Sequence, residues 1–191
     1  MARTKEFDPD AALERALELF WERGYEATSM ADLVEHLGIA RASIYGTFGG
    51  KHELYLKALE RYLQVKDPAI VQALSQPGRV LPAVRALIER YAEESITTDH
   101  GCMVVNTAVE LAARDPAAAR AVETSWTTLE TSLTSALTRA QAQGELAPDK
   151  DPRALARLLM TLFQGMRVMG RAGTEPARLR DAARQAQTLL T

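Results

Sequence analysis

The spacing of apolar residues along the chain predicts an all-helical protein. Apolar positions recur at intervals of three and four residues, which indicates helices with one buried face. Candidate capping residues, glycines and prolines separate these segments. The predicted helices cover residues 8–23, 28–37, 41–48, 51–65, 80–97, 102–113, 115–143, 152–171 and 175–190.

Two short helices on either side of Gly38 are the most informative part of the chain. The first has an apolar face at helical spacing, and Thr28 is placed to cap it because its hydroxyl can accept a free backbone N–H. The second is anchored by Ile44 and Phe48, which are four residues apart and share one face. Its other positions carry small side chains or hydrogen-bond donors. A helix-turn-helix unit that reads DNA needs this arrangement on its exposed helix.

The first third of the chain resembles the N-terminal domain of the TetR family of bacterial transcriptional regulators. The residues that carry the resemblance are Phe7, Ala16, Gly24, Tyr25, Thr28, Gly38, Ile44, Tyr45, Phe48, Lys51 and Leu54. The chain departs from the family pattern in three places. Ala40 replaces a capping Ser or Thr, Gly46 and Thr47 replace bulkier residues, and Gly49-Gly50 replaces a frequent Pro-Ser pair.

The resemblance implies that the second short helix enters the major groove. Arg41, with its preference for guanine, and the small residues beside it are the candidates for contacts to base edges. We expect the Tyr45 ring to pack against Leu37 or Phe48, with its hydroxyl on a phosphate, and Lys51 to contact a phosphate. The complete set of predicted DNA-binding residues is Thr28, Ser29, Arg41, Ala42, Ser43, Tyr45, Thr47 and Lys51.

The charge distribution gives DNA binding only local support. The net charge of the 191-residue chain is −2, and residues 1–66 carry nine Lys or Arg against eleven Asp or Glu. DNA affinity therefore depends on where the cations lie. We place a DNA-binding domain at residues 5–65 and a helical regulatory domain at residues 66–191, and the resemblance implies that the helix beginning at Lys51 links them.

The regulatory part is predicted to bind a small effector. The helix from Cys102 to Ala113 is apolar almost all round, which predicts full burial. Asn106 and Glu110 within it either form satisfied structural hydrogen bonds or line a ligand cavity, since a buried polar group is costly without a partner. The candidate ligand-binding residues are Tyr62, Tyr91, Cys102, Met103, Asn106, Glu110 and Phe163.

Two consecutive long helices, joined by a short loop, carry more apolar surface than one chain can bury. This excess predicts an intermolecular four-helix interface between two copies, and the resemblance also implies dimers formed through the last long helices. Gly165 would permit the close approach of a second helix. The predicted interface residues are Trp126, Leu129, Leu133, Leu158, Leu162, Gly165 and Met169.

Cys102, the single cysteine, has two interpretations. It stands at a predicted helix N-terminus two residues after His100, and both features favour a reactive thiolate. The segment Gly-Cys-Met-Val-Val at residues 101–105 also resembles electrophile- and oxidant-sensing members of the family. The alternative is a small buried hydrophobic residue, which is the more common role of a lone cysteine.

Taken together, these features predict a homodimeric, ligand-responsive repressor that binds a near-palindromic operator on double-stranded DNA and is released by a small apolar or electrophilic effector. A helical small-molecule-binding protein that has lost DNA binding is the alternative. No catalytic motif occurs, so we expect neither an enzyme nor a cofactor or metal site. His36 and His52 are expected at the surface or beside phosphates. Without a secretory or membrane-spanning segment, we expect a cytoplasmic protein.

Overall fold

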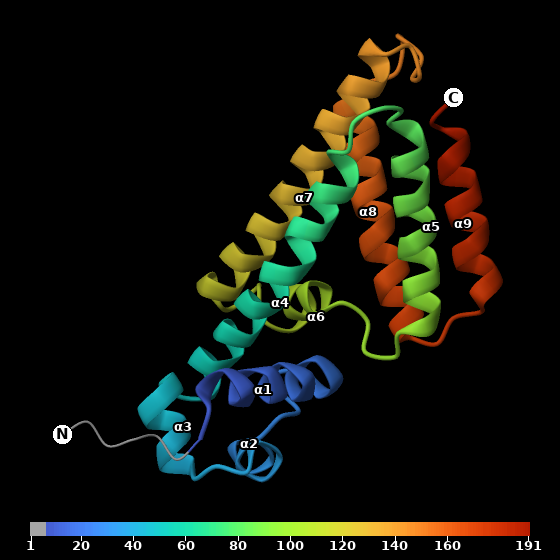
Figure 1. Cartoon of the computed structure of the whole chain (residues 1–191). Helices are drawn as coiled ribbons and strands as arrows, with labels where there is room; N and C mark the ends of the chain where they lie inside the picture. Colours follow the sequence, from blue (N-terminus) through green and yellow to red (C-terminus); the bar gives the residue numbers. More distant parts are fainter. Residues whose placement is uncertain (1–6) are drawn as a thin grey trace.

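A computed structural model describes residues 7–191. All regular elements in this range are α-helices, and the all-α prediction is confirmed. Their order is α1 (Pro9–Arg23), α2 (Met30–Leu37), α3 (Arg41–Phe48), α4 (Lys51–Leu74), α5 (Leu81–Thr97), α6 (Met103–Glu110), α7 (Pro116–Ala142), α8 (Pro152–Arg171) and α9 (Pro176–Thr188). Figure 1 shows α1–α3 as a separate unit at the base of a helical bundle. Residues 5 and 6 of the predicted first domain lie outside the described range.

The start of α2 differs from the sequence prediction. Ser29, not Thr28, is the N-cap, because the Ser29 hydroxyl accepts the Asp32 N–H at 3.1 Å while the Asp32 carboxylate accepts the Ser29 N–H at 2.7 Å. This reciprocal pair is a capping box. Thr28 is fully buried, and its hydroxyl donates to the Gly24 carbonyl at 2.7 Å. The prediction that Thr28 caps α2 is therefore wrong.

The helix α3 depends on its neighbours for stability. It is eight residues long and has no side-chain cap at Ala40, and an isolated helix of this length is unstable in water. Ile44 and Phe48 are buried in the apolar cluster that α3 forms with α1, α2 and the start of α4, which are its neighbours in the three-helix unit and beside it, as their spacing predicted. The other side of α3 is thereby held in a fixed orientation toward solvent.

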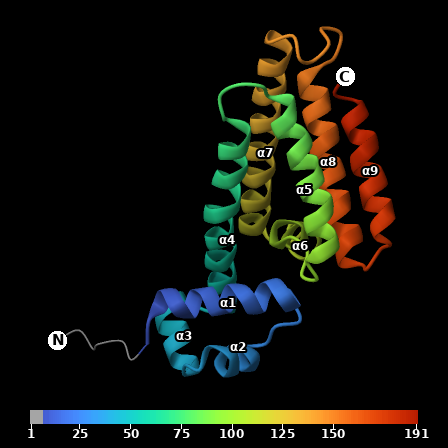
Figure 2. The same ribbon diagram turned by 45° about the vertical axis from the view of Figure 1, so that its right-hand side comes forward.

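The long helix α4 connects the three-helix unit to the bundle without a break (Figures 1 and 2). The predicted domain boundary between residues 65 and 66 lies in the middle of this helix. Pro68 also lies inside this helix. The helix α4 packs against both α1 and α7 and so contacts both parts of the molecule.

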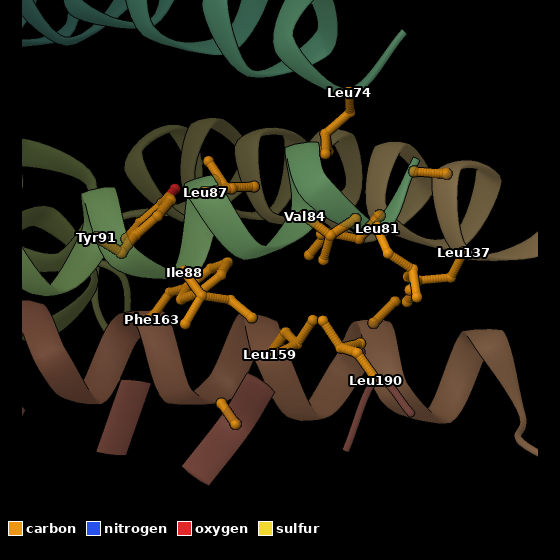
Figure 3. Close-up of a cluster of buried hydrophobic side chains, with 14 of the residues drawn as sticks. Leu74, Leu81, Val84, Leu87, Ile88, Tyr91, Leu137, Leu159, Phe163 and Leu190 are labelled. Atoms are coloured by element: carbon orange, nitrogen blue, oxygen red, sulfur yellow. The ribbon is translucent and has the colours of Figure 1, made fainter. Parts of the chain in front are cut away.

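Two apolar clusters fill the molecule. The distal core joins the end of α4 with α5, α7, α8 and α9; Figure 3 labels Leu74, Leu81, Val84, Leu87, Ile88, Tyr91, Leu137, Leu159, Phe163 and Leu190 in it. The junction core joins α1–α3 and the start of α4 with α6 and the start of α7, and includes Phe20, Leu33, Ile44, Tyr55, Cys102, Met103 and Val122. The three-helix unit therefore shares its core with the regulatory part.

The helix α6 is shorter and less buried than predicted. It ends at Glu110, and the side chain of Val109 is 77% exposed, so the prediction of full burial is wrong at this position. Met103, Val104 and Thr107 form its buried side. Within the chain, one close helix contact occurs at Gly170. A Cβ at Gly170 would lie 2.0 Å from the Ser95 carbonyl oxygen, whereas one at Gly165 would meet nothing within 4 Å.

Candidate functional site

The outward side of α3 carries the residues that the sequence singles out for base contacts. Arg41, Ala42, Tyr45 and Gly46 are exposed, and Ser43 and Thr47 are half-buried. The Tyr45 ring is 47% exposed, so the prediction that it packs against Leu37 or Phe48 is wrong. Ile44 and Phe48 occupy the buried side of this helix, and Tyr45 points away from it. The Arg41 guanidinium lies 5.8 Å from the centre of the Tyr45 ring, a cation–π contact.

Three of the predicted DNA-binding residues lie outside α3, and of these Ser29 and Lys51 are accessible to solvent whereas Thr28 is not. Ser29 is exposed, although its hydroxyl is engaged in the capping box. Lys51 is half-buried at the first turn of α4, and its ammonium lies 4.1 Å from the centre of the Tyr25 ring. Thr28 is removed from the candidate surface because its hydroxyl is buried and already bonded to Gly24.

The acidic residues of α1 are partly neutralised by cations of neighbouring helices. The Arg61 guanidinium pairs with Glu14 at 2.9 Å and with Asp10 at 3.2 Å. Arg23 lies 3.5 Å from the Asp32 carboxylate. Arg41, at the start of α3, is the one charged residue within this helix. The N-terminus of α4, which carries the positive end of the helix dipole, follows the other end of α3 after Gly49 and Gly50.

Backbone and side-chain hydrogen bonds connect the three-helix unit to α6 and the loop before it. The Tyr25 N–H donates to the Glu110 carboxylate at 3.0 Å, and the Trp21 indole N–H donates to the Gly101 carbonyl at 3.0 Å. Within the junction core, the hydroxyls of Tyr55 and Thr107 are 2.8 Å apart. Each bond joins residues more than fifty positions apart in the sequence, so the contacts fix how the two parts sit against each other.

Gly24 makes this junction unusually close. Its φ of 85° lies in a region that favours glycine, and a Cβ there would be 2.5 Å from a Glu110 carboxylate oxygen. Glu110 therefore forms a structural hydrogen bond at the junction and does not line an internal cavity. Asn106 also has a structural partner, since its amide donates to the His100 carbonyl at 3.1 Å. The structural interpretation of both residues is thereby supported.

His52 and Asp115 form a further link. The His52 Nε2 lies 2.5 Å from an Asp115 carboxylate oxygen, and this carboxylate also caps α7 by accepting the N–H groups of Ala117 and Ala118. Burial alone would raise the pKa of the Asp115 carboxyl, but the hydrogen bonds from His52 and from the two backbone groups hold it below its ordinary value. His52 thus contacts the regulatory part, and this contact was not foreseen from the sequence.

A cavity of about 190 Å³ opens between α4, α5 and α8. It is lined by Tyr62, Val65, Lys66, Ala69, Ile70, Arg90, Tyr91, Glu94 and Arg167. Of the predicted ligand-binding residues, Tyr62 and Tyr91 line it, and Phe163 lies behind Tyr91 with the two ring centres 4.0 Å apart.

Other predicted ligand-binding residues lie away from this cavity. Met103 is fully buried in the junction core. Asn106 and Glu110 instead line a separate surface groove of about 300 Å³ beside Val109 and Val168. The structure therefore does not gather the predicted ligand-binding set around one cavity.

Cys102 lies between the junction core and this cavity. Its side chain is 1% exposed, and its sulfur is 3.2 Å from the Lys66 ammonium and 3.5 Å from the Tyr62 hydroxyl. Burial alone would raise the pKa of the Cys102 thiol, but the positive charge of Lys66 and hydrogen bonds from the Val105 backbone, Tyr62 and Lys66 hold it below its ordinary value. The buried position and the lowered thiol pKa belong to the same residue, so Cys102 has features of both interpretations.

Sequence reasoning missed the three cations of the cavity, Lys66, Arg90 and Arg167, although two of them had a signal in the sequence. Lys66 comes four residues after Tyr62, and Arg167 comes four residues after Phe163. Each therefore lies on the same helical face as an aromatic residue that was singled out. The Arg167 side chain is nearly buried, pairs with Glu94 and lies over the Tyr91 ring, with the guanidinium carbon 4.8 Å from its centre. The sequence could have indicated both residues, because each is a charged residue at a position where the helical spacing predicts an apolar one.

The predicted dimer residues differ in how accessible they are: those on α8 reach the surface, Leu129 and Leu133 are buried, and Trp126 is half-buried. Leu158, Gly165 and Met169 are exposed on one side of α8 together with Val168, and Leu162 is half-buried beside them. Leu129 and Leu133 are buried in the distal core of the same chain, so their assignment to an intermolecular surface is wrong. Trp126 is half-buried and packs against the junction core. The outward side of α7 is rich in Thr and Ser, which leaves α8 as the apolar surface.

No helix within residues 7–191 is long and apolar enough to cross a membrane. The same range contains no group of three His, Cys, Asp or Glu side chains placed to hold a metal ion.

Comparison with known families gives two matches that together cover most of the chain. Residues 12–58 match the family described as bacterial regulatory proteins, tetR family. Residues 80–186 match the tetracyclin repressor-like C-terminal domain. The first match contains α2, α3 and most of α1, and the second contains the cavity-lining helices α5 and α8.

Individual relatives agree with these matches. The chain is 39% identical over 184 residues to the uncharacterized HTH-type transcriptional regulator YezE of Bacillus subtilis (strain 168), covering 95% of both chains. It is 34% identical over 186 residues to the HTH-type transcriptional repressor ComR of Escherichia coli (strain K12), covering 95% of this chain and 88% of ComR. A solved structure of a cysteine mutant of the TetR family regulator CifR, complexed with 26-base-pair operator DNA, is similar over 100% of both chains, with a TM-score of 0.86 and 28% identity.

Proposed function

Because the chain belongs to the TetR family of bacterial regulatory proteins, we propose that it is a homodimeric repressor that binds a near-palindromic DNA operator and is released by a small effector. The observation that carries this proposal is the exposed side of α3, where Arg41, Ala42, Tyr45 and Gly46 face solvent on a helix anchored from behind. The operator complex of the CifR mutant and the repressor function of ComR support it by similarity.

In this proposal α3 lies in the major groove. Arg41 reads a guanine edge, and Ala42, Ser43 and Thr47 contact neighbouring bases, where a small apolar group can touch a thymine methyl. Tyr45 is exposed enough for its hydroxyl to reach a phosphate, and Lys51 leaves the Tyr25 ring to do the same. Ser29 adds a contact at the N-terminus of α2, where free backbone N–H groups favour an anion.

Dimerisation brings two copies of α3 onto one face of the duplex. The apolar side of α8, with Leu158, Leu162, Gly165 and Met169, is the proposed contact surface. Gly165 carries no side chain that would hold a second helix away, and nothing in its own chain fills the space. Two reading helices would then enter successive major grooves, about 34–36 Å apart.

Effector release depends on the junction core. A ligand can act only through different affinities for two conformations. Binding in the cavity beside α4, or modification of Cys102, would move α4 and α6, and the hydrogen bonds of Tyr25, Tyr55 and His52 would pass this movement to the three-helix unit. The sequence favours an apolar or electrophilic effector. A Cys102→Ser variant that still releases DNA normally would reject a thiol-based response.

Selection of bound sequences from a random duplex pool tests the function directly. The proposal predicts an enriched inverted repeat, and an affinity for it that falls at least tenfold between about 50 and 200 mM salt, because phosphate contacts release counterions. A helical small-molecule-binding protein without DNA function would enrich no sequence while remaining folded. That result would reject the proposal.

Variants of the reading surface separate base contacts from phosphate contacts. Tyr45→Ala and Lys51→Ala should weaken binding to all sequences, whereas Arg41→Ala should relax the preference at one base position by about 1–3 kcal/mol. Lys57→Ala, an exposed lysine on α4, is the matched control. An Arg41→Ala variant that loses the same affinity on every sequence would exclude a base-reading role.

A further inference from the structure

The cavity between α4, α5 and α8 has an unbalanced charge. Its lining contains three cations, Lys66, Arg90 and Arg167, and a single carboxylate, that of Glu94. Glu94 is engaged by both arginines, at 3.7 Å from Arg90 and closer to Arg167. The lining therefore has more positive charge than its own groups can neutralise.

Lys66 is the residue that most needs a counterion. In the part of the chain that the structure describes, its ammonium forms no ion pair with a carboxylate, and its hydrogen-bond partner is the Cys102 sulfur. The neighbouring Asp67 accepts the Ser125 hydroxyl at 3.0 Å. Lys66 is half-buried, and burial of a cation is costly unless the cation is paired, so an anion from outside would stabilise this ammonium group.

Two polar atoms beside the cavity are also unpaired. The Tyr91 side chain is 2% exposed, and its hydroxyl has no hydrogen-bond partner among the described residues. The Nε of Arg167 is buried without a partner as well. In Figure 3 the Tyr91 hydroxyl lies at the edge of the distal core, beyond the stacked Phe163 ring. Buried donors are normally satisfied, and both of these atoms belong to residues that line the cavity.

The rest of the lining limits the kind of anion. Tyr62, Val65, Ala69 and Ile70 add apolar lining from α4, the helix that also carries Lys66. A volume of about 190 Å³ is below the roughly 300–1,000 Å³ of pockets that take drug-sized ligands, and it suits one ring or a short chain. The combination of cations, a free hydroxyl and a small apolar wall matches an organic carboxylate better than an inorganic anion.

We propose that the effector cavity takes a small organic carboxylate, whose carboxylate group lies against Lys66, Arg167 and the Tyr91 hydroxyl and whose apolar part lies against Tyr62, Val65 and Ile70. This inference rests on the proposed function, because it names the chemical class of the effector. Carboxylate binding would draw Lys66 away from Cys102, so the cavity and the thiol compete for one ammonium group.

Thermal unfolding of the full chain with matched probes tests this proposal. The probes are benzoate and hexanoate, each compared with its neutral amide, and inorganic phosphate. At a hundredfold excess over Kd, the better carboxylate should raise Tm by about 5 °C or more, while benzamide, hexanamide and phosphate should change it by less than about 1 °C. Equal shifts for an acid and its amide, an equal shift for phosphate, or no shift with either carboxylate would overturn the proposal.

Variants locate the binding site. Lys66→Met should weaken carboxylate binding at least tenfold in calorimetric titration, and Lys57→Met, on the same helix but exposed, should leave it unchanged. Tyr91→Phe preserves the ring and its stacking on Phe163, and should weaken binding about threefold to tenfold. Unchanged affinity in both Lys66→Met and Tyr91→Phe would place the carboxylate elsewhere and overturn the assignment.

Failure of this inference can be distinguished from failure of the proposed function. A chain that enriches an inverted repeat but binds no carboxylate probe remains a DNA-binding regulator, and only the effector class is rejected. A chain that binds benzoate through Lys66 but enriches no DNA sequence retains the cavity assignment and loses the proposed function.

Discussion

The distal core and the junction core differ in which parts of the chain their surrounding hydrogen bonds connect. The distal core consists of aliphatic and aromatic contacts between helices, with the stacked rings of Tyr91 and Phe163 at one end (Figure 3), and the long-range hydrogen bonds around it stay within the regulatory part. The junction core is also apolar, but the long-range hydrogen bonds of Trp21, Tyr25 and Tyr55 at its border join the first part of the chain to α6 and the loop before it. Apolar contacts are non-directional, whereas hydrogen bonds require particular distances and angles. The junction hydrogen bonds therefore constrain how the three-helix unit sits against the regulatory part.

Leu133→Ala should have the largest effect on stability. Leu133 is fully buried in the distal core, and its truncation leaves a cavity, so we expect a loss of about 2–5 kcal/mol in the free energy of unfolding. Leu158→Ala, on the exposed side of α8, is the contrasting variant and should weaken dimerisation instead. Denaturant unfolding and sedimentation measure the two effects. A Leu133→Ala protein of normal stability that dissociates into monomers would return Leu133 to the dimer interface.

Gly24→Ala should have the next largest effect, because it combines backbone strain with a steric clash. Its φ of 85° is unfavourable for alanine, and the added Cβ would displace the Glu110 carboxylate. We expect a loss of about 1–3 kcal/mol in thermal or denaturant unfolding. Gly144→Ala is a control with a positive φ of 73° and no neighbour within 4 Å, and it reports the backbone cost alone. Equal losses in both variants would show that the contact with Glu110 is unimportant.

The pair of hydroxyls in the junction core should show measurable coupling. Tyr55→Phe and Thr107→Val each remove one partner of the 2.8 Å hydrogen bond. A double-mutant cycle on the free energy of unfolding should give an interaction of about 0.5–1.5 kcal/mol. Additive effects within about 0.3 kcal/mol would mean that this bond does not join the two parts.

Gly46→Ala should have the smallest effect on stability and the opposite sign. A Cβ at Gly46 would meet nothing within 4 Å, and glycine is unfavourable inside a helix, so alanine should stabilise the protein by about 0.5–1 kcal/mol. If the bare backbone at Gly46 allows close approach to DNA, the same variant should bind the selected duplex less tightly. Increased stability with unchanged DNA affinity would exclude Gly46 from the interface.

Much of the architecture could be predicted from local sequence signals. Prolines at helix starts and caps such as Asp115 and Asp151 fix the ends of α7 and α8, and the Ile44–Phe48 spacing fixes the orientation of α3. These features depend on residues close together in the sequence. They therefore did not require knowledge of the tertiary fold.

The errors concern contacts between distant segments. The sequence could not show that Leu133 faces its own chain, that Glu110 accepts the Tyr25 N–H or that Lys66 reaches Cys102. Each depends on how helices far apart in the sequence pack. The prediction that the Tyr45 ring is packed was wrong for a local reason, because Tyr45 and its neighbour Ile44 cannot both lie on the narrow buried side of α3. The exposed side of α3 was thus more predictable than the lining of the cavity between α4, α5 and α8.

The central claim is that the junction core holds the reading helices in a binding-competent position. The most direct measurement is the DNA affinity of Glu110→Ala, made on the selected duplex with Glu123→Ala, an exposed residue of α7, as the control. Loss of the Tyr25 partner lowers the population of the competent conformation, and the apparent affinity falls with it. We predict a loss of at least tenfold with an unchanged dimer. Equal affinity of Glu110→Ala, Glu123→Ala and the unmodified protein would contradict the claim.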